Sequence, residues 1–136
     1  MKQCVKAYSN IYYAHHLCAG GEKNAQRNDT ARNYTVCYSG KHHCPLWVAA
    51  PRHAMYEKKG TDRTDAYGKD PKIPSSVQYN SKSTGGGCNK GHMLGSAERI
   101  CSAATNRQVF YYTNIALYLT TIDISKILHT PCTYVT

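Results

Sequence analysis

Apolar and β-branched residues gather in a few short stretches, separated by polar and glycine-rich sequence. Residues 34–38 combine tyrosine, threonine, valine and cysteine, a composition that predicts a strand. Residues 46–50 predict a second strand, which Pro51 ends. The segment between them, residues 38–43, has the composition of a hairpin turn, and Trp47 is expected to anchor the core.

The rest of the chain shows weaker periodicity. Residues 1–33 are polar and are predicted to be irregular, and residues 57–87, rich in glycine and proline, predict a long surface loop. Residues 96–107 favour one or two short helical turns, and residues 109–115 are the most strand-like stretch. From residue 116 onward the pattern matches neither a helix nor a strand. The predicted class is α+β with few helices.

Length and composition limit what the chain can be. Its 136 residues, 41 % hydrophobic and 18 % charged, predict a single globular domain over residues 1–136. No apolar run approaches the roughly 18 residues that a membrane helix needs, and the N-terminal stretch lacks the apolar segment of a secretion signal. A membrane-spanning protein and a disordered protein are therefore excluded.

The charge balance points to an anionic partner. Lysine and arginine number 17 against 8 aspartate and glutamate residues, which gives a formal net charge of +9. Such an excess favours nucleic acid or an anionic surface.

The 7 cysteines are an odd number and include no C-x-x-C pair, which disfavours a zinc ribbon. Cys37 and Cys44 flank the predicted turn, and Cys88 and Cys101 bracket the most motif-like segment, so two disulfides are one interpretation. Free buried thiols are the other. A zinc site formed by the turn cysteines and the two adjacent histidines between them is a weaker alternative.

A Gly-His pair lies within the segment Asn89-Lys90-Gly91-His92. Glycine lets the backbone approach a ligand closely, and the lysine supplies positive charge. By itself a lone histidine is more often structural than catalytic. An acidic–basic pair, Glu98-Arg99, and then the run Phe-Tyr-Tyr-Thr-Asn at residues 110–114 follow it along the chain.

This ordered set resembles the DNA/RNA non-specific endonucleases of the ββα-metal, or His-Me finger, group. The resemblance covers roughly residues 30–116 and includes Asp70-Pro71, which is similar to the loop before the family motif. It implies a ββα-metal finger on a mostly antiparallel sheet. Residues 117–136 diverge from the family, so the fold is expected to be incomplete at its C-terminal end.

The resemblance also implies roles for individual residues. His92 corresponds to the general base that activates water, because a neutral imidazole can take a proton near pH 7. Lys90 stands where the family has arginine, and with Arg63 and Asn89 it would bind substrate phosphate. The residues expected to order the site or to be structural are Asn114, Arg99 and Glu98.

The family implies a divalent cation, Mg²⁺ or Mn²⁺, acting as a Lewis acid. Asp123 occupies the position of the family's metal-binding asparagine, and Asn114 is a second expected ligand. The position of the family's glutamate is Pro131, which cannot bind a metal. Asp123 can serve only if residues 117–128 form a helix, which their β-branched residues disfavour.

Three functions therefore follow. The first is metal-dependent, sequence-non-specific hydrolysis of DNA and RNA. The second is a degenerate module that binds nucleic acid without cutting it. The third is a disulfide-stapled basic secreted protein in which the Gly-His pair is accidental. Family resemblance and cysteine content favour a secreted or periplasmic location.

Overall fold

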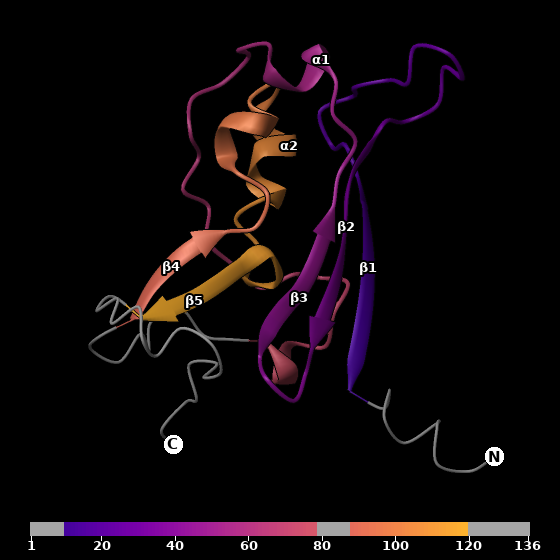
Figure 1. Cartoon of the computed structure of the whole chain (residues 1–136). Helices are drawn as coiled ribbons and strands as arrows, with labels where there is room; N and C mark the ends of the chain where they lie inside the picture. Colours follow the sequence, from indigo (N-terminus) through magenta and orange to yellow (C-terminus); the bar gives the residue numbers. More distant parts are fainter. Residues whose placement is uncertain (1–9, 79–87, 120–136) are drawn as a thin grey trace, which may run out of the picture.

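The computed structural model of the chain describes residues 10–78 and 88–119. The described residues form two antiparallel sheets and the short helices α1 and α2. Both helices lie toward the same end of the molecule in Figure 1. Strand β3 lies against β5, so the two sheets are in contact. The elements are β1 (Ile11–Leu17), β2 (Arg32–Ser39), β3 (Cys44–Ala49), α1 (Ala54–Glu57), the 3₁₀ turn η2 (Ser75–Val77), β4 (Cys88–His92), the 3₁₀ turn η4 (Ser96–Arg99), α2 (Ala103–Gln108), the 3₁₀ turn η5 (Tyr112–Asn114) and β5 (Ile115–Leu119).

The larger sheet has three antiparallel strands in the order β1-β2-β3. Strands β2 and β3 form the predicted hairpin, in which Ser39 pairs with Cys44. The turn between them includes His43 with a positive φ of 50°, a left-handed conformation that is uncommon outside glycine. The predicted strands at residues 34–38 and 46–50 are confirmed, and the second ends one residue before Ala50. The α+β class is confirmed as well.

Strand β1 shows that the prediction of an irregular N-terminal third was wrong. Ala14 and His16 are buried, whereas Tyr13, His15 and Leu17, which alternate with them, are exposed, the period of two of a half-buried strand. A histidine occupies one of the inward positions. The alternation of apolar and polar residues is therefore not visible in the sequence.

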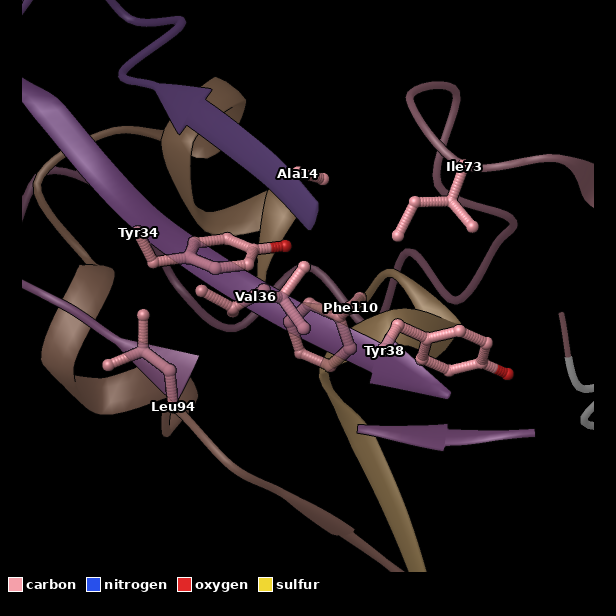
Figure 2. Close-up of a cluster of buried hydrophobic side chains, with 8 residues drawn as sticks. Ala14, Tyr34, Val36, Tyr38, Ile73, Leu94 and Phe110 are labelled. Atoms are coloured by element: carbon pink, nitrogen blue, oxygen red, sulfur yellow. The ribbon is translucent and has the colours of Figure 1, made fainter. Parts of the chain in front are cut away.

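The core lies between the inner face of the larger sheet and the segments that follow β4. Figure 2 shows Tyr34, Val36 and Tyr38 of β2 packed with Leu94 and Phe110. Both tyrosines are fully buried. The complete buried cluster consists of Ala14, Tyr34, Val36, Tyr38, Ile73, Leu94, Val109 and Phe110.

Trp47 does not anchor this core, so that prediction was wrong. Its side chain is 44 % exposed and lies 6.1 Å, centroid to centroid, from the ring of Tyr13. Val48, the next residue along β3, packs against the core instead. Because neighbouring residues of a strand point to opposite faces, Trp47 must lie on the outer face.

The prediction of a strand over residues 109–115 was also wrong. Val109 and Phe110 directly follow α2 and are fully buried, and residues 112–114 form η5. The strand begins at Ile115, where β5 pairs antiparallel with β4. Burial in the core, not strand pairing, explains the apolar run.

The helical turns expected over residues 96–107 are confirmed as η4 and α2. The hydroxyl of Ser102 caps α2 by accepting a hydrogen bond from the Thr105 N–H at 3.3 Å. No helix in the described part of the chain is long and apolar enough to cross a membrane.

Of the two interpretations of the cysteines, the described ones match free thiols and not the two disulfides. Cys37 lies opposite Trp47 rather than Cys44, and both Cys37 and Cys44 are free thiols. Cys101 is a free thiol too, so it is not joined to Cys88. Among the described residues, no group of three or more histidine, cysteine or acidic side chains could hold a metal, which removes the zinc site considered for the hairpin turn.

The loop predicted over residues 57–87 is partly buried where it is described. Asp70 is 1 % exposed, and its Oδ2 accepts hydrogen bonds from His16 Nε2 at 2.8 Å and from the Thr113 hydroxyl at 2.7 Å. The backbone N–H of Lys72 donates to Asp70 Oδ1 at 2.9 Å. These bonds tie β1, the loop and η5 together, while residues 79–87 lie outside the described part.

Stability is expected to fall in acid because of Asp70. Burial acts to raise the pKa of this carboxyl group, but the hydrogen bond and charge of His16 and the hydrogen bonds of Thr113 and Lys72 outweigh it, so the pKa lies below its ordinary value. The stabilisation is complete above the unfolded pKa of about 3.9 and is lost as the pH falls through the lower folded pKa. Urea unfolding between pH 7 and pH 2.5 measures this loss.

Asp70→Asn should have lower stability at pH 7 and a flatter acid dependence than the parent chain. Equal acid slopes for the two proteins would contradict the assignment to Asp70.

Candidate functional site

His92 is the last residue of β4 and lies opposite Ile115 of β5. Beyond it, the N–H of Met93 donates to the Asn114 carbonyl at 2.9 Å, which extends the contact between the two segments. The imidazole ring meets Phe110 edge to face, with centroids 4.7 Å apart, and lies 6.0 Å from the ring of Tyr67. The ladder and two aromatic rings therefore fix the orientation of His92.

One nitrogen of this imidazole is unsatisfied. His92 Nε2 is buried and has no hydrogen-bond partner among the residues that the structure describes. Buried polar atoms without a partner are rare and commonly mark a place where water or a ligand binds. This atom is therefore the candidate reactive group of the site.

The electrostatic environment keeps His92 uncharged. Burial lowers the pKa of His92, and the positive charge of Arg63 lowers it further, while Asp65 raises it in part. The net direction is below the ordinary value of about 6.5. At neutral pH the ring is thus in the neutral form that can accept a proton.

Two cations lie around the same aromatic rings. The guanidinium carbon of Arg63 is 4.9 Å from the centroid of Phe110, and Lys90 Nζ is 4.5 Å from the centroid of Tyr67. Arg63 Nε also donates to Asp65 Oδ1 at 2.5 Å. The structure therefore brings together three residues that the sequence singled out, His92, Lys90 and Arg63.

Asn89 is not part of this cluster. It precedes Lys90 on β4, and successive strand residues point to opposite faces, so Asn89 lies on the other face from Lys90 and His92. Its side chain is exposed. A role in binding substrate stays a prediction.

Asn114 is fully buried and uses both ends of its amide. Its Oδ1 accepts from the Leu94 N–H at 3.0 Å, and its Nδ2 donates to the carbonyls of Leu94 at 3.0 Å and Val109 at 2.8 Å. These bonds support the predicted role in ordering the segment after His92. They leave the amide oxygen already engaged, which does not favour the predicted role as a metal ligand.

Arg99 is 2 % exposed and holds chain segments together, as expected of a structural residue. Its guanidinium donates to Asn33 Oδ1 at 2.9 Å and to the carbonyls of Asn33 and Pro51 at 3.1 and 2.6 Å. Glu98 accepts from the Gly95 N–H at 3.0 Å and lies 3.7 Å from Arg52. Neither side chain reaches His92 through these contacts.

The described residues do not supply a set of metal ligands. Neither residues 10–78 nor residues 88–119 contain three or more histidine, cysteine or acidic side chains that converge on one point. Asp123 lies outside the described residues. Leu117 belongs to β5, so the helix that Asp123 requires does not begin there.

Tyr67 and Asp65 contribute to the site but were not expected from the sequence. Both lie in the loop before Asp70, where periodicity is absent. The available signals were the short spacing between Arg63 and Asp65 and an aromatic residue within a polar loop.

Comparison with known protein families agrees with this arrangement. The family model of the DNA/RNA non-specific endonucleases matches residues 17–116. This range includes the cluster around His92, which consists of Arg63, Asp65, Tyr67, Lys90, His92 and Phe110. A comparison with curated proteins gave no significant match. The antiparallel sheets and few helices are consistent with the ββα-metal fold. The match covers most of the chain, and the protein therefore belongs to the DNA/RNA non-specific endonuclease family.

Proposed function

We propose that the protein hydrolyses phosphodiester bonds of DNA and RNA without sequence preference, with His92 as the general base. The observation that carries this proposal is the buried, unpartnered Nε2 of an imidazole kept neutral beside two cations. Family membership supports the substrate class.

Each residue of the cluster has a defined part in this proposal. His92 takes a proton from the attacking water, whose oxygen bonds to phosphorus as the bond to the leaving oxygen breaks. Lys90 and Arg63 hold the negative phosphate oxygens near the imidazole. Lysine acts there as a point charge and does not give the bidentate contact of an arginine.

We also propose dependence on Mg²⁺ or Mn²⁺, which the family supports. Such an ion, when bound, would supply Lewis-acid chemistry to the phosphodiester. The described residues contain no group of three or more histidine, cysteine or acidic side chains that could hold the ion, and the proposed ligand Asp123 lies outside them. We therefore expect weak cation binding, and activity below that of a family member with a full ligand set.

The activity should rise with pH through a midpoint below about 6.5. The reason is that His92 must be neutral to act, and its pKa is lowered by burial and by Arg63. Initial rates on a labelled duplex between pH 4.5 and pH 8, at fixed ionic strength, give this midpoint. A rate that falls as the pH rises from 5 to 7 would contradict a neutral imidazole as the base.

Binding should depend on salt and not on base sequence. Phosphate contacts release counterions, so log affinity is expected to fall linearly with log salt concentration, with a slope of about −0.9 per phosphate contact. Titration of two unrelated duplexes of equal length, in chelator to prevent cleavage, measures both properties. A clear preference for one duplex would count against the proposal.

The second candidate function is binding without cleavage. The observation that favours it is the lack of a convergent ligand set among the described residues. Salt-dependent binding together with no cleavage at any tested concentration of Mg²⁺ or Mn²⁺ would identify this function.

A further inference from the structure

Tyr67 lies against both cations of the candidate site and beside its imidazole. Lys90 Nζ lies over the Tyr67 ring, and the Tyr67 hydroxyl oxygen accepts a hydrogen bond from Arg63 Nη2 at 3.1 Å. The ring also lies 6.0 Å from the His92 ring and packs edge-on against Phe110 at 5.0 Å. One side chain thus bridges both cations and borders the imidazole.

The backbone of Tyr67 is held in place by the segment that follows α2. The neighbouring Gly68 accepts a hydrogen bond from the Tyr112 N–H at 2.8 Å, and its own N–H donates to the Phe110 carbonyl at 3.4 Å. On the other side, Asp65 adopts a positive φ of 48°, and its carbonyl accepts from the Tyr67 N–H at 2.9 Å. These contacts fix the position from which the ring projects.

Apart from Tyr67, Arg63 contacts the Phe110 ring and Asp65, but both cations are open to solvent. Lys90 is exposed, and Arg63 is 51 % exposed with its carboxylate partner Asp65 equally open to solvent. Long exposed side chains sample many rotamers, and an exposed ion pair by itself restricts them little. The Tyr67 ring and the Tyr67 hydroxyl restrict the rotamers of Lys90 and Arg63 before substrate arrives. Less side-chain entropy is then lost when the two cations bind phosphate.

We propose that Tyr67 is a positioning residue that holds Lys90 and Arg63 beside His92 and so determines how tightly the site binds substrate phosphate. This inference rests on the proposed function, because it assigns the two cations to phosphate. The two contacts of Tyr67 can be removed separately by substitution. The ring acts on Lys90, and the hydroxyl acts on Arg63.

The test uses the full chain with substitutions that remove these contacts one at a time. Tyr67→Phe keeps the ring and removes the hydroxyl, whereas Tyr67→Leu removes both. The affinity for a short duplex is measured in chelator, and KM and kcat are measured with added Mg²⁺. Tyr67→Leu is expected to raise Kd and KM roughly tenfold with a much smaller change in kcat, and Tyr67→Phe to raise them about threefold.

A double-mutant cycle tests the coupling directly. Lys90→Ala should weaken binding in the parent chain. It should also make the fall of log affinity with log salt concentration shallower, by the contribution of about one phosphate contact. In the Tyr67→Leu background the same substitution should have little further effect, because Lys90 is no longer positioned. Independent, additive effects of the two substitutions would overturn the proposal.

The matched control is Tyr12→Leu. Tyr12 is a half-buried tyrosine of β1 that packs against the same core cluster as Tyr67. Its loss should lower stability by a similar amount and leave Kd unchanged. An equal rise of Kd in Tyr12→Leu and Tyr67→Leu would reduce Tyr67 to a packing residue.

The outcomes for Tyr67 and for the proposed function differ. A parent chain that binds in chelator but does not cut with Mg²⁺ would refute hydrolysis, and the binding cycle would still decide the role of Tyr67. A parent chain that cuts, with a Tyr67→Leu variant of parental Kd and KM, would refute the positioning role alone.

Discussion

Replacing His92 with alanine is expected to slow phosphodiester cleavage by about 10²–10⁴-fold, the usual contribution of a general base. The imidazole is half-buried at the end of β4, and the ladder with β5 is formed by the backbone. Removal of the side chain is therefore expected to leave this ladder intact. Single-turnover rates on a labelled duplex with saturating Mg²⁺ give the effect on chemistry, separate from any effect on binding.

His42→Ala is the matched control. His42 is exposed in the β2–β3 turn, where its backbone N–H donates to the Ser39 hydroxyl at 3.1 Å. Its loss should leave the rate unchanged. A His92→Ala protein that is folded and cuts as fast as the parent would remove His92 from the reaction.

Replacing Arg99 with alanine is expected to lower the free energy of unfolding by about 3 kcal/mol or more. The substitution removes a buried guanidinium and leaves the acceptors of Asn33 and Pro51 without their donors. It also removes the cation that lies 4.0 Å from the Tyr56 ring centroid. Urea unfolding followed by tyrosine fluorescence measures the change in midpoint.

Arg107→Ala provides the reference for this loss, because Arg107 is an exposed arginine in the last turn of α2. Its effect should stay within about 0.5 kcal/mol. If the two variants unfold at the same urea concentration, the buried network around Arg99 does not stabilise the fold as described.

The elements that could be predicted are those whose pattern is local. The β2–β3 hairpin follows from β-branched and aromatic residues flanking a turn, and η4 and α2 follow from short runs of helix-compatible residues. Strand β1 escaped prediction because its inward histidine is hydrogen-bonded to a partner, Asp70, that lies 54 positions away in the chain. A tertiary hydrogen bond of this kind leaves no mark on periodicity.

Trp47 illustrates a second limit of prediction from the sequence. Its size predicted burial, but a one-residue difference in register puts Val48 toward the core and Trp47 on the outer face. The run at 109–115 failed for a related reason, since apolar residues are required equally by a strand and by a buried connection. Composition alone does not distinguish these cases.

The candidate site was only partly visible in the sequence. The order of the motif residues identified His92, Lys90 and Arg63, and the structure brings Arg63 to the other two although it lies far from them in the chain. Tyr67 was missed because its importance lies in contacts to residues 4 and 23 positions away, which only the fold creates.

The measurement that tests the central claim most directly is cleavage of a supercoiled plasmid and of an unrelated RNA by the full chain. Each reaction is run with Mg²⁺, with Mn²⁺ and with chelator, and is repeated with the His92→Ala variant. The account predicts slow, sequence-independent cutting of both substrates that requires the cation and disappears with the imidazole. Cleavage that persists in chelator or in the variant, or substrates that remain intact under every condition, would contradict it.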